Sequence, residues 1–402
     1  MLALSQSADN KRPLEGGHKR NYRSIDVAVV GAGAFGGWSA LCLQERGLHV
    51  LSIDAYGPAS PRASSGGETR SLRAGYGAKP FYTQWAARAM SHWQARSVEL
   101  DRQVLFPNDR IEMSREWTPA LIEQRRIFDR LKLPYHILNQ AELQARYPQI
   151  NVDDIAFGFL ETSQTAAIIR AQDATVQVQE LLRRKGGRSM IGRVMPGKAN
   201  GRTLLTLAMN NDEEVQAGQF VFACGPWSPK TLPGAMATKV RVKRFEYHYW
   251  GLPTGDDRFA WPNQPAWHDH TTGGYGFGSL GRGIKYSPGG PPRDIDVDTS
   301  DRLPNPESLA KCRAYMAHRF PALKDAPVVG ANVCQTEMTV SDDFIIDRHP
   351  DYDNVWIASG GGGHAFKFGP MIGDHVADLV TGKAVNPEMA ALFAYASKSD
   401  ID

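Results

Sequence analysis

Three glycines carry the clearest chemical signal in the sequence: Gly31, Gly33 and Gly36 form a G-x-G-x-x-G pattern. In such a pattern the first glycine permits a tight turn, the second lets a pyrophosphate approach the backbone, and the third lets a helix pack close to a strand. Asp54 follows at about the 20-residue spacing at which a carboxylate accepts hydrogen bonds from an adenosine ribose. These residues predict a dinucleotide site, and they do not decide between FAD and NAD.

The elements that must position these glycines follow one another in the same stretch. The apolar, β-branched run from Ile25 to Val30 is typical of a buried parallel strand. An apolar helix pattern follows the glycines and ends at Gly47, a good C-terminal stop, and a second strand is expected at 48–53. This order of elements argues against the alternative, a glycine-rich turn that binds nothing.

A basic and aromatic cluster comes next, in the stretch GETRSLRAGYG at 67–77. Arg70, Arg73 and Tyr76 are spaced three apart and would share one face if the segment were helical. The alternative is a solvated basic turn. Because the segment directly follows the dinucleotide unit, we expect it to lie where the reactive end of a ligand would be.

A second strand–glycine–helix junction lies near the C-terminus. The apolar run Val355–Ser359 leads into four consecutive glycines at 360–363, and a helix is expected from Pro370 to Leu379. The N-terminus of a helix at this place could stabilise negative charge on a reduced flavin. An NAD enzyme has no evident need for such a junction, so the pattern favours FAD.

Composition excludes several other classes of protein. The chain has 402 residues, enough for two domains, with 42% hydrophobic and 22% charged residues and a net charge of only +3, which gives no reason to expect nucleic acid. No apolar run has the length of a membrane span. The four cysteines are far apart without C-x-x-C spacing, which indicates neither a metal site nor disulfides and suits a reducing, cytoplasmic compartment. Residues 1–24 are predicted to form a flexible arm and not a signal peptide.

Four stretches resemble the monomeric sarcosine oxidase and N-methyltryptophan oxidase family, within the wider glycine/D-amino-acid oxidase group. They are 25–37, 67–77, 334–349 and 360–368, and the strongest motifs are GETRSLRAGYG, DDFIIDRHP and GHAFKF. The resemblance implies that the first glycine motif binds FAD and that the flavin is attached through an 8α-cysteinyl link. Cys334 stands at the matching position; the alternative for it is a buried structural thiol.

The resemblance also implies roles for three basic residues. Arg73 and Lys367 match the pair that binds the substrate carboxylate, and a forked guanidinium with an ammonium suits that task. Lys285 matches the lysine that helps oxygen react; the alternative is a solvated strand lysine. The predicted catalytic residues are Lys285, Arg73 and Lys367, the cofactor-binding residues are Gly31, Gly33, Gly36, Asp54, Thr69, Arg70, Cys334, Gly361, Gly363, His364 and Lys367, and the substrate-binding residues are Arg73, Tyr76, Tyr275, Thr336 and Lys367.

Three positions depart from the family pattern. Gly66 and Gly289 stand where the family often has histidines, and Thr336 stands where it usually has a tyrosine. All three are expected to lie on the substrate side, where smaller residues predict a roomier pocket and a substrate larger than sarcosine.

The resemblance implies an α/β fold, a Rossmann-like FAD-binding domain with an antiparallel-sheet substrate domain inserted. We expect the FAD domain at 25–105, 165–237 and 340–390, the substrate domain at 106–164 and 238–339, and a C-terminal tail at 391–402.

The expected reaction is oxidation of a carbon–nitrogen bond in an N-substituted, cyclic or otherwise modified amino acid with a carboxylate. Molecular oxygen would take the electrons, and an imine and hydrogen peroxide would form. The expected protein is a monomer or homodimer without a nucleic-acid or membrane partner. Two alternatives stay open: a dehydrogenase of the same fold that reduces a quinone or carrier protein, and a flavin-binding subunit with little activity of its own.

Overall fold

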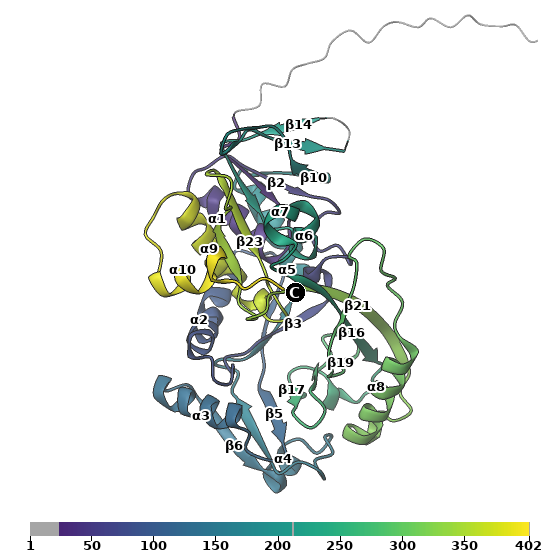
Figure 1. The fold of residues 1–402 in the computed structure, drawn as a ribbon. Coiled ribbons are helices and arrows are strands. Elements are labelled where there is room, and N and C mark those ends of the chain that lie inside the picture. The colour runs from purple at the N-terminus through teal and green to yellow at the C-terminus, as the bar shows by residue number, and fades with distance from the viewer. Residues whose placement is uncertain (1–23, 211–212, 402) are drawn as a thin grey trace, which may run out of the picture.

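The computed structural model describes residues 24–210 and 213–401, so the predicted arm at 1–24 lies outside the described residues except for Ser24. Figure 1 shows two lobes, one around the strands β2 and β23 and the other around β5, β16, β17 and β21. Among the described residues, no helix combines the length and the apolar character needed to cross a bilayer.

The first lobe is built on a six-stranded sheet in the order β22-β23-β15-β1-β2-β9. All neighbours are parallel except β22, which runs antiparallel to β23. The strands come from distant parts of the chain, which explains why no single stretch contains the whole lobe. Their bounds are β1 (Val27–Val30), β2 (Val50–Asp54), β9 (Arg188–Ile191), β15 (Gln219–Phe222), β22 (Ile345–Arg348) and β23 (Val355–Ser359).

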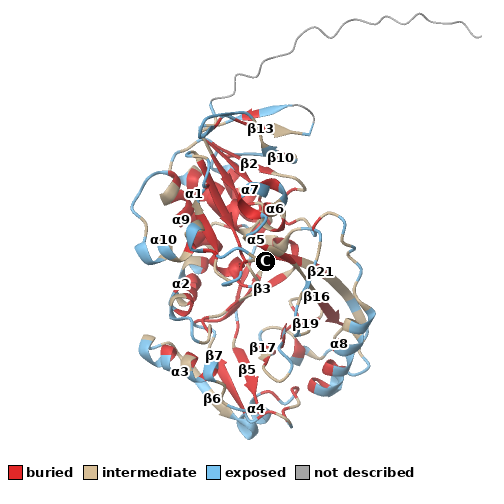
Figure 2. Cartoon of the chain, in the orientation of Figure 1, coloured by how far each residue is buried: buried red, intermediate tan, exposed pale blue. Residues whose placement is uncertain are grey.

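Both faces of this sheet are covered, as continuous apolar strands require. Val27 and Val29 pack toward the helices, whereas Ala28 and Val30 pack on the opposite side, against a small sheet and two short helices. Figure 2 shows the resulting buried centre of the lobe. The helices on the first side are α1 (Ala34–Glu45), α2 (Pro80–Ser97), α5 (Ala171–Arg184) and α9 (Gly369–Val380), and the other side has α6 (Ser228–Thr231), α7 (Pro233–Met236), β10 (Val194–Pro196), β13 (Thr206–Met209) and β14 (Glu214–Gln216).

The second lobe contains a nine-stranded sheet whose neighbours are antiparallel except for the parallel pair β5 and β17. One face packs on α8, and the alternating pleat turns every second residue toward the other lobe. The strands are β5 (Arg110–Ser114), β6 (Tyr135–Asn139), β7 (Phe157–Glu161), β16 (Arg241–Trp250), β17 (Ala266–Asp269), β18 (Gly274–Phe277), β19 (Ile284–Ser287), β20 (Arg293–Asp294) and β21 (Val328–Met338), with helices α3 (Pro119–Leu131), α4 (Gln140–Arg146) and α8 (Pro306–Arg319).

A three-stranded sheet differs from one sequence-based expectation. The stretch 67–77 contains β3 (Thr69–Leu72) and no helix, so Arg70 and Arg73 do not share a helix face. Helix α5 begins only at Ala171, because Ala167–Arg170 forms β8 and pairs with both β3 and β4 (Leu105–Pro107). The β-branched Ile168 and Ile169 suit that strand.

The last segment of the chain packs against the first lobe. Helix α10 (Pro387–Phe393) ends in Phe393, which is fully buried in the core that also contains α1 and α9. Farther on, the Ile401 amide donates to the Thr238 carbonyl over 2.7 Å. A two-stranded hairpin of β11 (Ala199–Asn200) and β12 (Thr203–Leu204) completes the elements.

Candidate functional site

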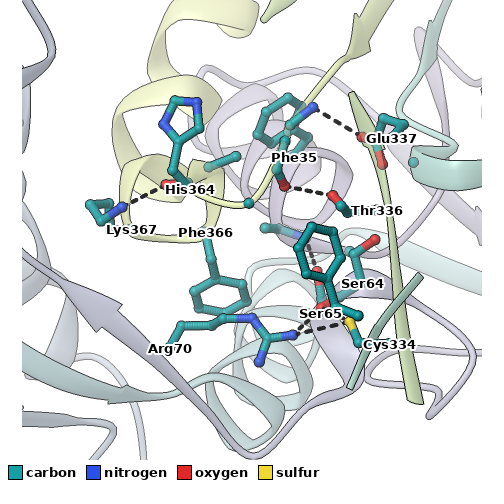
Figure 3. Close-up of a pocket in the computed structure, with 18 of the residues that line it drawn as sticks. Phe35, Ser64, Ser65, Arg70, Cys334, Thr336, Glu337, His364, Phe366 and Lys367 are labelled. Carbon is teal, nitrogen blue, oxygen red and sulfur yellow. Dashed lines mark hydrogen bonds between the residues drawn. The ribbon is translucent and has the colours of Figure 1, made fainter. Parts of the chain in front are cut away.

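A cavity of about 940 Å³ is lined by residues of both lobes and contains most of the residues singled out in the sequence. Its size lies near the upper end of the range of roughly 300–1,000 Å³ that ligand pockets have. It extends from the first glycine motif past Cys334 to Lys367 (Figure 3). The sites predicted at the two ends of the sequence therefore belong to one cavity.

The glycines of the first motif are required by close packing. A side chain on Gly31, whose φ is +103°, would overlap the carbonyl oxygen of Ala223, and one on Gly36 would overlap that of Gly31. Gly33 is different, because a Cβ there would meet only the Ser65 side chain, with Oγ at 3.2 Å. Gly31 and Gly33 line the cavity, whereas Gly36 packs behind the turn. The backbone is thus open to a ligand at Gly33.

The carboxylate of Asp54 lies at the end of β2 and orders the glycine turn. Its Oδ2 accepts a hydrogen bond from the Ala32 amide over 2.7 Å, and its Oδ1 accepts from the Tyr56 amide over 2.9 Å. The Ser65 hydroxyl accepts from the Ala34 amide over 2.9 Å, at the start of α1. Asp54 and Ser65 both line the cavity, so they fix the turn and remain within reach of a ligand.

Cys334 and Arg70 meet in the middle of the cavity. An Arg70 Nη donates to the Ser64 carbonyl over 2.5 Å and lies 3.7 Å from the Cys334 sulfur, as Figure 3 shows. A second Nη of Arg70 donates to the Thr69 carbonyl over 2.8 Å. The sulfur is partly exposed to the cavity, unlike the buried thiols of Cys42 and Cys312. Cys334 therefore lies in the cavity beside a guanidinium.

Arg73 and Lys367 both contact Tyr76. The Arg73 guanidinium is 4.4 Å from the centre of the Tyr76 ring and donates to the Gly75 carbonyl. The Lys367 ammonium donates to the Tyr76 hydroxyl over 2.8 Å and to the His364 carbonyl over 2.7 Å. Burial, and next the charge of Arg73, hold the pKa of Lys367 well below its usual value. An anion bound here would stabilise both positive charges.

Lys285 lies on β19 and points across the cavity floor to β3. Its ammonium donates to the carbonyl of Thr69 over 3.1 Å and lies 4.0 Å from the centre of the Tyr247 ring. The Thr69 hydroxyl lies 3.3 Å away. Burial, and next the charge of Arg70, lower the pKa of Lys285 well below its usual value. Lys285 is buried, so the alternative of a solvated strand lysine is wrong.

The second glycine junction closes the cavity above β21. The Gly361 amide donates to Glu337 over 3.2 Å, and the Thr336 hydroxyl donates to the Gly362 carbonyl over 2.5 Å. A Cβ on Gly363 would meet nothing within 4 Å. Burial lowers the pKa of His364 to about 3, so this ring is neutral at pH 7. Gly361, Gly363 and His364 all line the cavity.

One face of the nine-stranded sheet forms the cavity floor. Register places Tyr275 opposite Ser287, Lys285 opposite Tyr249, and Cys334 opposite Phe245. The alternate residues pack on the other side, in the core beneath the sheet. Strand pairing thus gathers residues from five distant segments: Glu112 on β5, His268 on β17, Tyr275 on β18, Lys285 on β19 and Cys334 on β21.

Two of the three departures from the family pattern do not widen the cavity. A Cβ on Gly66 would overlap the carbonyl of Ser60, and one on Gly289 would overlap that of Thr272; neither glycine lines the cavity. The expectation that all three lie on the substrate side is therefore wrong for these two. Thr336 does line the cavity, so it alone supports a roomier pocket.

Several cavity residues had not been predicted from the sequence. Glu337 is fully buried, and burial raises its pKa to about 7. A second group, Arg110, Glu112, His268 and His270, forms a polar wall near Arg73. Alternation of charged and apolar residues in RIEMS, at 110–114, was the available signal for the wall, but only the pairing of β5 with β17 brings the histidines to it.

The residues present fit FAD. Gly33 leaves its backbone open for a pyrophosphate, Asp54 lies at the ribose position at the end of β2, and Cys334 faces the cavity beside Arg70. Thr69, Arg70, Gly361 and Gly363 lie around the same space. The cavity continues beyond this part to Arg73 and Lys367, which leaves room for a substrate.

Comparisons with known proteins agree with this geometry. A model of the family described as FAD dependent oxidoreductase matches residues 26–379. The chain is 27% identical to a monomeric sarcosine oxidase of Streptomyces avermitilis, over 90% of this chain and 96% of that one, and 25% identical to an N-methyl-L-tryptophan oxidase of Citrobacter koseri, over 89% and 95%.

Among solved structures, the fold is similar to that of NikD, described as an unusual amino acid oxidase essential for nikkomycin biosynthesis. The TM-score is 0.80 at 18% identity, with 94% of this chain and 98% of that chain covered. This likeness supports the α/β fold of an FAD-dependent oxidase. Because the family model spans most of the chain, the protein belongs to the FAD dependent oxidoreductase family and is an enzyme of its amine and amino-acid oxidase type.

Proposed function

We propose that the protein oxidises a carbon–nitrogen bond of an N-substituted, cyclic or otherwise modified amino acid, and that it produces an imine and hydrogen peroxide. The observation that carries this proposal is the position of Arg73 and Lys367, two cations around Tyr76 in the cavity that also contains the glycine motif and Cys334. FAD, when bound, would take a hydride from the carbon beside the amine and pass two electrons to oxygen.

Arg73 and Lys367 would hold the substrate carboxylate. A buried ammonium is unfavourable without an anion, and burial together with Arg73 already lowers the pKa of Lys367. A carboxylate between the two cations would stabilise the charged lysine and accept a forked hydrogen bond from the guanidinium. It would also fix one end of the substrate, and a fixed end orients the reacting carbon.

Lys285 would serve oxygen. It lies on the floor of the cavity, donates to the Thr69 carbonyl, and lies over the rings of Tyr247 and Phe277. A preorganised cation in a dry site stabilises negative charge as it develops on oxygen. The Arg70 guanidinium, which donates to the carbonyls of Ser64 and Thr69, would provide a second positive charge nearby.

Cys334 would hold FAD covalently through a thioether to the 8α carbon. Formation of the link replaces one S–H and one C–H bond by an S–C bond, and the two electrons and two protons released reduce one oxygen molecule to hydrogen peroxide. Acid precipitation should leave yellow colour in the pellet of the wild type and of Cys224→Ala, since Cys224 is a second cavity thiol. Cys334→Ala should release the colour, and a colourless wild-type pellet would refute the link.

The reaction is tested with matched substrates. Proline and pyrrolidine differ by the carboxylate, as do sarcosine and dimethylamine, and each pair is mixed without oxygen while flavin absorbance is followed. We expect the carboxylate members to bleach the flavin faster, and peroxide to form in equal amount to substrate after oxygen is admitted.

The alternatives give different results in the same experiment. A dehydrogenase would bleach with substrate and then recover faster with a quinone than with oxygen. A flavin-binding subunit would show no bleaching over a wide set of N-alkyl and cyclic amino acids. Equal bleaching by both members of each pair would mean that Arg73 and Lys367 do not bind a carboxylate.

A further inference from the structure

The cavity has a polar wall that the redox machinery does not use. Glu112 on β5 and His268 on β17 lie opposite each other in the register of the parallel pair, so both side chains project from the same face of the sheet. His270 follows directly after β17, and its Nε2 lies 2.7 Å from a Glu112 oxygen. The His268 Nδ1 lies 3.9 Å from that oxygen. All three residues line the cavity.

The negative charge of the Glu112 carboxylate is already paired with neighbouring side chains. Its other oxygen accepts a hydrogen bond from Arg110 over 2.5 Å and one from Gln124 over 3.3 Å. Burial alone would raise the pKa of Glu112, but Arg110 and His270 hold it well below its usual value. Glu112 is therefore ionised and paired, and the wall adds little net charge to the cavity.

The two imidazoles can donate hydrogen bonds as well as accept them, whereas the ionised carboxylate only accepts. Burial lowers the pKa of His268 to about 4, so its ring is neutral at pH 7. A neutral imidazole has one N–H donor and one acceptor nitrogen. His268 and His270 keep 29% and 22% of their side chains exposed, toward the cavity that they line. The wall thus presents hydrogen-bond donors and acceptors together.

A metal ion fits this wall poorly, although the ligand atoms of Glu112, His268 and His270 lie within 4.8 Å of one another. Arg110 is in contact with Glu112, and the charge of Arg73 acts on His268. A cation bound to the three residues would be repelled by both guanidiniums. A second anion on the ligand would in turn meet the ionised Glu112.

The wall adjoins the carboxylate clamp. Glu161 bonds to Arg110 over 3.0 Å and also accepts from the Ala74 amide over 2.7 Å, directly beside Arg73. The charge of Arg110 acts on Lys367 as well. A substrate whose carboxylate is held by Arg73 and Lys367 would therefore extend its other end toward Glu112 and His268.

We propose that Glu112, His268 and His270 form a subsite for uncharged hydroxyl groups on the distal part of the substrate, such as a hydroxylated N-alkyl chain. A hydroxyl both donates and accepts, so it matches a carboxylate beside imidazole nitrogens. An alkyl or indolyl group would offer the imidazole nitrogens that face the cavity no hydrogen-bond partner. The inference rests on the proposed function for the other end of the substrate.

The test uses two ligands that bind without being oxidised. (2,3-Dihydroxypropoxy)acetate and propoxyacetate carry the same carboxylate, have an ether in place of the amine, and differ only in two hydroxyls. Titration calorimetry on the FAD-loaded enzyme should give roughly tenfold tighter binding of the dihydroxy compound, since each hydrogen bond to a buried polar group contributes to the difference. The corresponding N-substituted glycines should differ in KM more than in kcat.

Variants locate the subsite. His268→Leu should abolish the preference for the dihydroxy compound, and His268→Gln, which keeps a donor and an acceptor, should retain most of it. Glu112→Gln should reduce it. His136→Gln is the control, because His136 is exposed on β6 and away from the cavity, and it should keep the wild-type ratio.

Each contrary outcome has a distinct meaning. Equal binding of both ethers by the wild type would overturn the subsite and leave the carboxylate clamp intact. Binding of neither ether would overturn the clamp, and the subsite with it. If His268→Leu kept the wild-type ratio of affinities for the two ethers, the groups that recognise the hydroxyls would lie elsewhere in the cavity. One equivalent of zinc held after dialysis, and lost in His268→Leu, would show a metal site in its place.

Discussion

Lys285 and Lys367 have similar environments in the cavity, although we propose a different function for each. Lys285 and Lys367 are both almost completely buried, both contact aromatic rings, and both have pKa values lowered chiefly by burial. A buried ammonium is stabilised when an anion binds or forms beside it. In the proposed reaction the anion is a permanent carboxylate at Lys367 and a developing charge on oxygen at Lys285.

Removal of either cation of the clamp should weaken catalysis strongly. Loss of one partner of a desolvated charge pair costs about 2–5 kcal/mol, so Arg73→Met or Lys367→Met should lower kcat/KM for a carboxylate substrate by roughly 30-fold or more. Lys311→Met, at an exposed position of α8, is the matched control. Steady-state kinetics with flavin content measured in parallel gives the answer; unchanged kcat/KM in both variants would place the clamp elsewhere.

Replacement of Lys285 should separate the two half-reactions. Lys285→Met should slow reoxidation by oxygen by about 100-fold, whereas anaerobic reduction by substrate should change much less, because only the first creates an anion beside this lysine. Stopped-flow absorbance measures both steps. Lys285→Arg keeps the charge and should be slowed less. Equal slowing of both half-reactions would make Lys285 structural.

The pH dependence of reoxidation follows from the same residue. The charged lysine is the active form, and its pKa is lowered by burial and by Arg70. The rate should therefore be high at low pH and fall as the pH rises through that lowered pKa, below the range in which an ordinary lysine titrates. Lys285→Met should show no such fall. A wild-type rate that stays constant until the range of an ordinary lysine would contradict the assignment.

At the scale of elements, the dinucleotide unit was predictable because its signals are local. Strand, turn, helix and strand follow one another within 27–54, and the structure has β1, α1 and β2 there. The segment around Arg70 was harder, because its basic spacing suits a helix while pairing with β8 makes it a strand. The wall of Glu112 and His268 could not be predicted from the sequence, because the pairing of strands so far apart in the chain leaves no local pattern.

The close packing of α1 on its turn gives a prediction for one glycine. Gly36→Ala places a methyl group against the carbonyl of Gly31, which is backbone and cannot turn aside. The variant should bind less FAD and unfold at lower temperature than the wild type. Gly234→Ala, where a Cβ would meet nothing within 4 Å, should behave normally. Flavin absorbance per protein and thermal unfolding measure both effects; normal FAD content in Gly36→Ala would contradict this account of the turn.

At the scale of the whole molecule, Glu337 links the two lobes. It lies on β21 of the large sheet and accepts from Gly361 at the second glycine junction. Burial raises its pKa from 4.5 to about 7, so the folded protein favours the protonated acid. The stability that this proton contributes to the folded state is fully present below the ordinary pKa of a glutamate, and it is lost as the pH rises through the raised pKa.

The wild type should therefore lose stability relative to Glu337→Gln between about pH 4.5 and pH 7. The difference between the two pKa values corresponds to ~3 kcal/mol of unfolding free energy. Urea unfolding of both proteins at pH 5 and pH 8 measures the change. Glu246→Gln, on the neighbouring strand β16, is a suitable comparison. A constant difference across this range would mean that Glu337 is ionised in the folded state.

The cavity floor and the core beneath it use alternate residues of the same strands, which has a consequence for engineering. A library that varies only Glu112, His268 and Tyr275 changes the surface met by a substrate, while Ile111 and Met113, on either side of Glu112 in β5, keep the core filled. Substrate range and thermal tolerance can thus be altered in separate experiments. An insertion or deletion of one residue within β5 would exchange the two sets and lose both properties at once.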